Sequence, residues 1–175
     1  MLKIALIIAF RNFRDEEYFI PKEVFERAGA SVITFSTAIG TAVGVHGGEV
    51  PAQLTVEELK VADYDAVIFV GGAGAKKLME NEDALRVVRE TVASEKILAA
   101  ICIAPTILAR AGVLFGKKAT VWSSSMDRSA IKILQEEGVL YREGPIVVDG
   151  KIITANGPEV AREFARKVLA LLTSG

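Results

Sequence analysis

Residues 96–112, KILAAICIAPTILARAG, carry the strongest fold signal in this chain of 175 residues. The apolar run at 96–101 is typical of a strand that is covered on both faces, as in a parallel sheet. Cys102 follows this run directly. Pro105 then suits the first turn of a helix, and Gly112 suits its end. A buried strand that passes straight into a helix predicts an α/β protein.

Two more runs have the same character, KIALIIA at residues 3–9 and DAVIFV at 65–70. A helical pattern follows each of them, at 15–28 and 82–93. This alternation predicts a doubly wound, mostly parallel sheet with helices on both faces. The other expected elements are strands at 31–36, 119–122, 139–141, 146–148 and 152–155, a hairpin within 40–50, a helical turn at 55–59, and helices at 105–111, 127–137 and 158–172. Because no repeat or linker interrupts the pattern, we expect a single domain spanning residues 1–175.

The composition excludes several classes of protein. Hydrophobic residues make up 51% of the chain and charged residues 25%, with a net charge of −1. No basic run offers a surface for nucleic acid. The apolar runs are too short to span a bilayer, and Arg11 restores charge too early for a signal peptide. We therefore expect a cytoplasmic protein without nucleic-acid or membrane partners. Few amide side chains beside many charged ones point to a thermophilic source.

Cys102 is the only cysteine and His46 the only histidine. No intramolecular disulfide can form, and the two residues cannot supply the three or four ligands of a zinc site. The glycine-rich turn at 71–74 is neither the dinucleotide fingerprint G-x-G-x-x-G nor a phosphate loop. We expect neither a metal nor a cofactor. His46 is interpreted as exposed or structural, and the serines at 123–125 have no base beside them.

Cys102 is the candidate nucleophile. A residue at a strand-to-helix turn projects from the top of a sheet, as in the nucleophile elbow of hydrolases. The N–H groups and partial positive charge at the start of the next helix favour a thiolate, so they are expected to lower the pKa of the thiol. The alternative is an inert cysteine that packs as a small buried hydrophobe.

Glu17 lies on the apolar stripe of the helix expected at 15–28. The other members of this stripe are Ile20, Pro21, Val24 and Ala28. Because an unpaired buried carboxylate is costly, Glu17 is expected to be protonated or partnered. A protonated Glu17 can donate a hydrogen bond to a thiolate at the same end of the sheet. Alternatively, Pro21 disrupts the helix and Glu17 turns out to water.

The turn Gly71-Gly72-Ala73-Gly74 connects a strand to a helix. Glycine allows backbone N–H groups to approach a ligand closely, so this turn and the amide of Ile103 are candidates for an oxyanion hole. The simpler interpretation is a tight turn that requires positive φ angles. Trp122, Gly71 and Gly74 are expected to line the pocket.

Five segments, in order along the chain, match motifs of a known protein family. They are Asp15-Glu16-Glu17 with Ile20-Pro21, Gly71-Gly72-Ala73-Gly74, Ala99-Ala100-Ile101-Cys102 with Pro105, Ala111-Gly112-Val113-Leu114 with Gly116, and Val147-Val148-Asp149-Gly150 with Ile153-Thr154. In these segments the chain resembles the ThiJ/PfpI superfamily, which includes a parkinsonism-associated human protein and the archaeal intracellular PfpI proteins. The resemblance covers nearly the full length of the chain.

This resemblance implies a flavodoxin-like fold and a site in which the Cys102 nucleophile is hydrogen-bonded to a buried Glu17. It places the oxyanion amides at Gly72 and Ile103. It also implies a stress-response protein that assembles as a homodimer or a larger homo-oligomer. Activities reported for the family include those of a peptidase, a glyoxalase, a deglycase, a holdase chaperone and an oxidation sensor.

The chain departs from the family at two positions. Family members carry a histidine directly after the cysteine or in the strand region of Trp122, and here the residues are Ile103 and Trp122. Peptide cleavage normally needs both a base and an acid. We therefore expect Cys102 to attack a small reactive carbonyl, such as methylglyoxal, with Glu17 shuttling the proton. The alternatives are a PfpI-type peptidase acting on peptides, an oxidation sensor and a chaperone with an inert cysteine.

Overall fold

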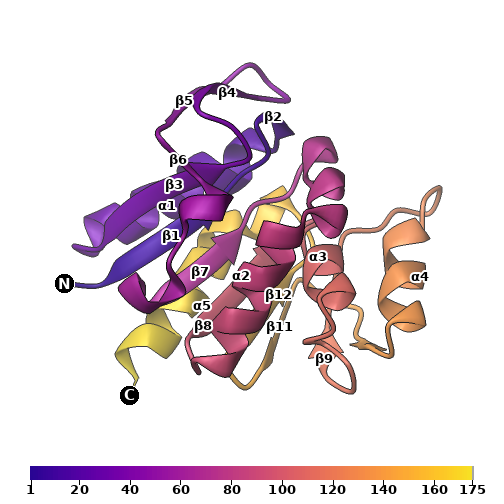
Figure 1. Cartoon of the computed structure of the whole chain (residues 1–175). Helices are drawn as coiled ribbons and strands as arrows, with labels where there is room; N and C mark the ends of the chain where they lie inside the picture. Colours follow the sequence, from indigo (N-terminus) through magenta and orange to yellow (C-terminus); the bar gives the residue numbers. More distant parts are fainter. Residues whose placement is uncertain (175) are drawn as a thin grey trace.

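A central sheet of seven strands organises the computed structural model, which describes residues 1–174. The strand order is β11-β12-β8-β7-β1-β3-β6 (Figure 1). All neighbours are parallel except β11 and β12, which form an antiparallel pair. The strands are β1 (Lys3–Ile7), β3 (Ser31–Ser36), β6 (Leu54–Thr55), β7 (Ala66–Phe69), β8 (Ile97–Ile101), β11 (Ile146–Asp149) and β12 (Ile152–Ala155). This topology confirms the predicted doubly wound α/β sheet.

Helices cover both faces of the sheet (Figure 1). On one face, α1 (Asp15–Arg27) packs against α5 (Ala161–Thr173). On the other face, α2 (Glu82–Ala93) packs against α3 (Pro105–Arg110), and α4 (Ser129–Glu136) packs against α3. This arrangement of two helical layers around a parallel sheet is the flavodoxin-like fold.

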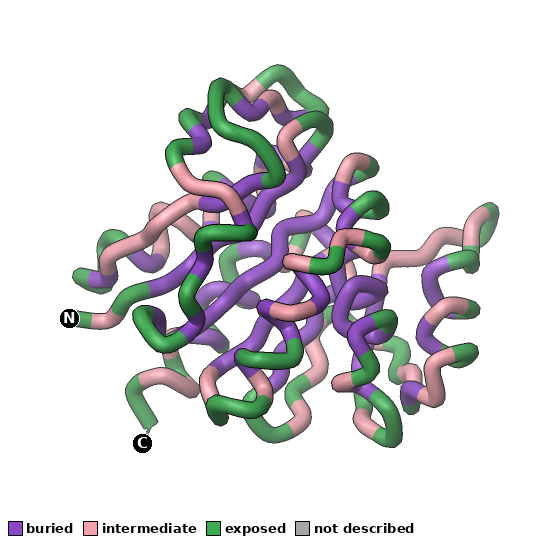
Figure 2. The backbone as a smooth tube through the Cα atoms, viewed as in Figure 1, coloured by how far each residue is buried: buried purple, intermediate pink, exposed green. Residues whose placement is uncertain are grey.

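The residues of β8 alternate between two hydrophobic cores. Leu98 and Ala100 belong to the core under α2 and α3, whereas Ala99 and Ile101 belong to the core under α1 and α5. All four side chains are fully buried, and Figure 2 shows buried backbone along the central strands. A strand that is buried on both faces has no polar side to alternate with, which explains the unbroken apolar runs in the sequence.

A small three-stranded sheet stands beyond the carboxyl end of β1, at the top of Figure 1. β4 (Gly40–Gly44) and β5 (Glu49–Ala52) form the hairpin expected within 40–50. β2 (Arg11–Phe13) pairs with β4 and was not predicted, because a three-residue strand has no readable periodicity. The 3₁₀ helix η3 (Ala73–Glu80) was also not predicted.

The strand predicted at 119–122 is wrong. β9 covers only Lys118–Ala119, and it pairs with β10 (Leu140–Tyr141) in a separate two-stranded sheet. The chain leaves this ladder at Thr120, whose backbone N–H donates to the hydroxyl of Thr154 (3.0 Å). A side-chain acceptor therefore replaces the backbone acceptor that a longer strand would need.

Two helices start later than predicted, and one short turn is confirmed. α4 starts at Ser129 because the carboxylate of Asp127 accepts the Ser129 N–H (3.0 Å) and ends the preceding turn. A 3₁₀ turn, η4 (Pro158–Val160), precedes α5. The expected turn at 55–59 is η1 (Val56–Glu58), and a further turn, η2 (Val61–Asp63), follows it. Within residues 1–174, no helix has the length and apolar character needed to cross a membrane.

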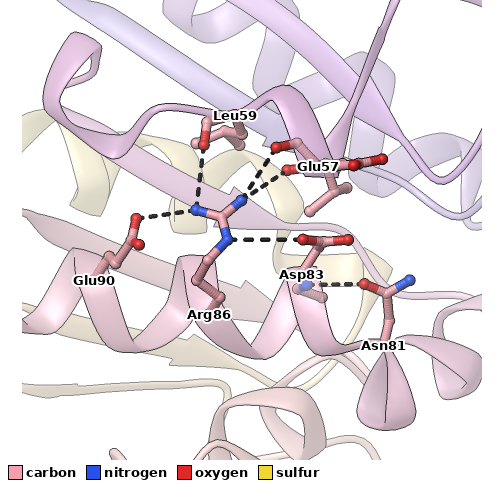
Figure 3. A network of polar contacts seen from close by, with 8 residues as sticks. Glu57, Leu59, Asn81, Asp83, Arg86 and Glu90 are labelled. Atoms are coloured by element: carbon pink, nitrogen blue, oxygen red, sulfur yellow. Dashed lines mark hydrogen bonds and ion pairs between the residues drawn. The ribbon is translucent and has the colours of Figure 1, made fainter.

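Figure 3 shows how the connection between β6 and β7 is fixed to α2. The Nη2 group of the Arg86 guanidinium donates to the backbone carbonyls of Val56 (3.3 Å) and Glu57 (3.4 Å). The Nη1 group of Arg86 donates to the carbonyl of Leu59 (3.5 Å) and to the carboxylate of Glu90 (3.1 Å). One planar side chain thus satisfies three carbonyls of η1 and its flank, which a single ammonium group could not reach together.

Replacing Arg86 with methionine is expected to lower the free energy of unfolding by about 1–2 kcal/mol, because part-buried carbonyls lose their donors. Lys22→Met is the matched control, since it removes only the Lys22–Glu26 helix pair (2.6 Å), which is worth about 0.3–0.5 kcal/mol. Urea unfolding at pH 7 measures both variants. Equal losses in the two variants would contradict this role for Arg86.

Candidate active site

The topological switch point of the sheet lies between β1 and β7. From β1 the chain continues to β3 on one side, whereas from β7 it continues to β8 on the other. Ligands of such sheets bind outside the carboxyl ends of the strands at this point. Three predicted features reach it: Glu17 in α1, the turn Gly71–Gly74 after β7, and Cys102 after β8.

Cys102 occupies a strained elbow. Its φ angle is 65°, in the left-handed region that non-glycine residues rarely adopt. The Cys102 N–H donates to the carbonyl of Ala155 at the end of β12 (2.9 Å), and the Cys102 carbonyl accepts the N–H of Trp122 (2.9 Å). These two hydrogen bonds hold the turn from both sides, so the strained conformation is maintained by the neighbouring strand and by the segment after β9.

Glu17 is fully buried beside this elbow. Its Oε1 accepts the N–H of Gly71 (3.0 Å), and its carboxyl interacts with the Cys102 thiol. Its Oε2 has no partner of ordinary hydrogen-bond geometry in the described part of the chain. α1 runs unbroken through Pro21. The alternative in which Glu17 turns out to water is therefore wrong, and its burial is confirmed.

Burial raises the pKa of Glu17 to about 8, although hydrogen bonds from Cys102 and Gly71 act in the opposite direction. Burial, and then the charge of Glu17, raise the pKa of Cys102 to about 12, although the amides of Ile103 and Gly72 lower it. The lowered thiol pKa expected from the sequence is thus wrong in direction. Below about pH 8, however, Glu17 keeps its proton, so its charge no longer opposes the thiolate and its O–H can donate to sulfur.

Only glycine fits at two positions next to this pair. A Cβ on Gly71 would lie 2.6 Å from the Cβ of Cys102 and 2.7 Å from the Oε1 of Glu17. Gly72 has a φ angle of 108°, and a Cβ there would collide with the backbone that connects β2 to α1. The amides of Gly72 and Ile103 lower the pKa of the Cys102 thiol. These are the two amides that the resemblance implied for an oxyanion hole, and that role stays a prediction.

Cys102 opens onto a cleft of about 360 Å³. The cleft is lined by Arg14, Val45, His46, Gly72, Ala73, Lys76, Cys102, Ile103, Trp122 and Asp127. Trp122 therefore lines the cleft as the sequence predicts, and Gly72 and Ile103 line it as well. Gly71 instead packs beneath the Cys102 side chain, and Gly74 borders a separate depression because it packs against the backbone of β2.

Sequence reasoning missed four polar residues of this cleft: Arg14, His46, Lys76 and Asp127. They come from the start of α1, the β4–β5 turn, η3 and the loop before α4. None of these segments has a periodic pattern, so only tertiary contacts bring the four side chains together. Among residues 1–174, no group of three potential ligands could hold a metal ion.

Comparison with known proteins accounts for this arrangement. The model of the DJ-1/PfpI family matches residues 2–171. The chain belongs to the DJ-1/PfpI family. It is 41% identical over 168 residues to the protein MJ0967 of Methanocaldococcus jannaschii, covering 95% of this chain and 80% of that protein. It is 29% identical over 168 residues to "Deglycase PH1704" of Pyrococcus horikoshii, covering 96% of this chain and 98% of that protein.

The fold of this family member also matches a solved structure. The ThiJ/PfpI domain protein of Brachyspira murdochii superposes with a TM-score of 0.93 at 33% identity, covering 99% of this chain and 97% of that chain. The resemblance seen in the sequence segments is thereby confirmed at the level of family and fold.

The raised pKa of Glu17 determines how the free energy of unfolding depends on pH. Between the ordinary carboxyl pKa of 4.5 and about 8, the folded protein binds a proton at Glu17 that the unfolded chain does not bind. The free energy of unfolding therefore falls as pH rises through this window, by at most about 1.4 kcal/mol per pH unit. Glu17→Gln removes this contribution. We expect urea unfolding between pH 5.5 and 7.5 to give a flatter profile for the variant than for the wild type.

Glu23→Gln serves as the control on the same helix, because Glu23 forms only an exposed pair with Arg27 (3.1 Å). Its pH profile is expected to parallel that of the wild type. Parallel profiles for Glu17→Gln and the wild type would instead mean that Glu17 is already ionised at pH 5.5.

Proposed function

We propose that this protein is a cysteine-dependent enzyme that acts on small reactive carbonyl compounds, with the Cys102 thiolate as nucleophile and Glu17 as its proton partner. The observation that carries this proposal is the buried Glu17 carboxyl, which keeps its proton to about pH 8, beside a cysteine on a strained elbow. An inert structural cysteine requires neither feature. The deglycase name of the Pyrococcus relative supports an activity on carbonyl chemistry.

The reaction can be written for a 2-oxoaldehyde such as methylglyoxal. The Cys102 sulfur attacks the aldehyde carbon, an S–C bond forms, and the π electron pair passes to the oxygen. The amides of Gly72 and Ile103 stabilise the resulting negative charge. Transfer of the C1 hydrogen to C2 as a proton, through an enediol, oxidises C1 and reduces C2 to give a thioester. Water then releases lactate and the thiol, so no external oxidant or reductant is needed.

Glu17 has a specific part in this sequence. Because it is protonated at neutral pH and touches the sulfur, it can donate a hydrogen bond to the thiolate before attack and take up or return a proton afterwards. Peptide hydrolysis needs one more group in the site, because an acid must also protonate the leaving amine. Ile103 and Trp122, which stand where relatives of the family carry histidine, cannot provide one. Carbonyl addition is therefore the reaction that suits these residues better.

Lactate formation from methylglyoxal tests this function. The wild-type protein is expected to form lactate faster than buffer alone, and Cys102→Ala is expected to fall to the buffer rate because it lacks the nucleophile. Glu17→Gln is expected to lose about 10²-fold or more, because a positioned proton-transfer group typically contributes that much. A wild-type rate equal to that of buffer would contradict the proposal. Cleavage of casein that is lost in Cys102→Ala would favour the peptidase alternative.

A further inference from the structure

The turn between β4 and β5 forms one wall of the Cys102 cleft through Val45 and His46. This turn is not loose. The buried carboxylate of Asp15 accepts the backbone N–H of His46 (2.8 Å) and that of Gly48 (2.7 Å). Gly48 lies so close that a Cβ there would be 2.6 Å from Asp15 Oδ2. The turn is thus fixed to the first residue of the same helix that carries Glu17.

The imidazole of His46 belongs to a row of charged groups at the cleft. Its Nε2 lies 3.5 Å from Oε1 of Glu16, and Oε2 of Glu16 lies 2.8 Å from Nε of Arg14. The other charged groups of the cleft are Lys76 and Asp127. A carboxylate beside an imidazole orients its ring, as the third member of a catalytic triad does.

We propose that His46 is a second proton-transfer residue of this site, which protonates the carbonyl oxygen of the substrate while Cys102 adds to its carbon. The proposal rests on the proposed function, and it replaces the histidines missing at Ile103 and Trp122 with one from a different element. Glu17 lies on the sulfur side and is fully buried, whereas the side chain of His46 is 58% exposed on the cleft wall. We assign Glu17 to the sulfur end and His46 to the oxygen end of the reacting S–C–O unit.

The step balances without another reactant. The sulfur lone pair forms the S–C bond, the π pair moves to oxygen, and the proton on Nδ1 of the imidazolium, the ring nitrogen that does not face Glu16, passes to that oxygen. The neutral imidazole then takes its proton back in the reverse step or from water. Imidazole suits this exchange because its ring nitrogens can both donate and accept a proton.

His46→Gln tests the proposal cleanly, because the backbone N–H that Asp15 holds is kept. Glu49→Gln, on the exposed start of β5, is the matched control. Three rates are measured for each protein: lactate formation from methylglyoxal, protection of Cys102 by methylglyoxal against alkylation, and alkylation by iodoacetamide. Alkylation releases iodide and needs no proton donor, so it reports the reactivity of the thiolate alone.

The expected result for His46→Gln is a loss of about 10²-fold in lactate formation and slower protection by methylglyoxal, with alkylation within about twofold of the wild type. Lactate formation within about threefold of the wild type would overturn the role of His46 and leave the proposed function standing. If the wild type makes no lactate, the proposed function fails. In that case, protection by methylglyoxal that is slower in His46→Gln than in the wild type and Glu49→Gln would still support proton transfer by His46. Equal protection in His46→Gln and the wild type would overturn the role of His46. A Cys102 that methylglyoxal does not protect in any of the proteins overturns both proposals.

Discussion

The contact between the buried carboxyl of Glu17 and the thiol of Cys102 constrains everything around it. A carboxyl group without exposure to water is tolerated only if it is neutral or well partnered, and here the one fixed donor is the N–H of Gly71 (3.0 Å). The contact requires glycine at position 71, because any Cβ there would collide with both groups. It also requires the left-handed elbow at Cys102, which the hydrogen bonds to Ala155 and Trp122 hold in place.

The same contact explains how a buried cysteine can remain chemically useful. Burial alone disfavours the thiolate, and an ionised Glu17 would disfavour it further. A protonated Glu17 reverses the second effect, because a neutral O–H group donates to the sulfur instead of repelling it. The amides of Gly72 and Ile103 act in the same direction. Glu17 and Cys102 thus titrate as a coupled pair, in which the proton on Glu17 decides whether the carboxyl opposes or assists the thiolate.

Much of this could be predicted from local patterns. The apolar runs and the helix ends fixed the α/β class, and the apolar stripe of α1 identified Glu17 as an anomalous carboxyl. Its buried stripe includes Phe25, however, while Ala28 is exposed. The chain beyond β9 was misjudged because the hydroxyl of Thr154 replaces a backbone acceptor. His46 was dismissed because its place on the cleft depends on Asp15, which lies 31 residues away in the sequence.

The protonation state of Glu17 tests most directly whether this carboxyl assists the Cys102 thiolate. Infrared difference spectra between the wild type and Glu17→Gln isolate the absorption of this one carboxyl group across a pH titration. We expect the C=O stretch of a protonated carboxylic acid at pH 7, which fades as pH rises through about 8. A carboxylate band at pH 7, with no protonated form until strongly acidic pH, would mean that Glu17 opposes the thiolate and cannot be its proton partner.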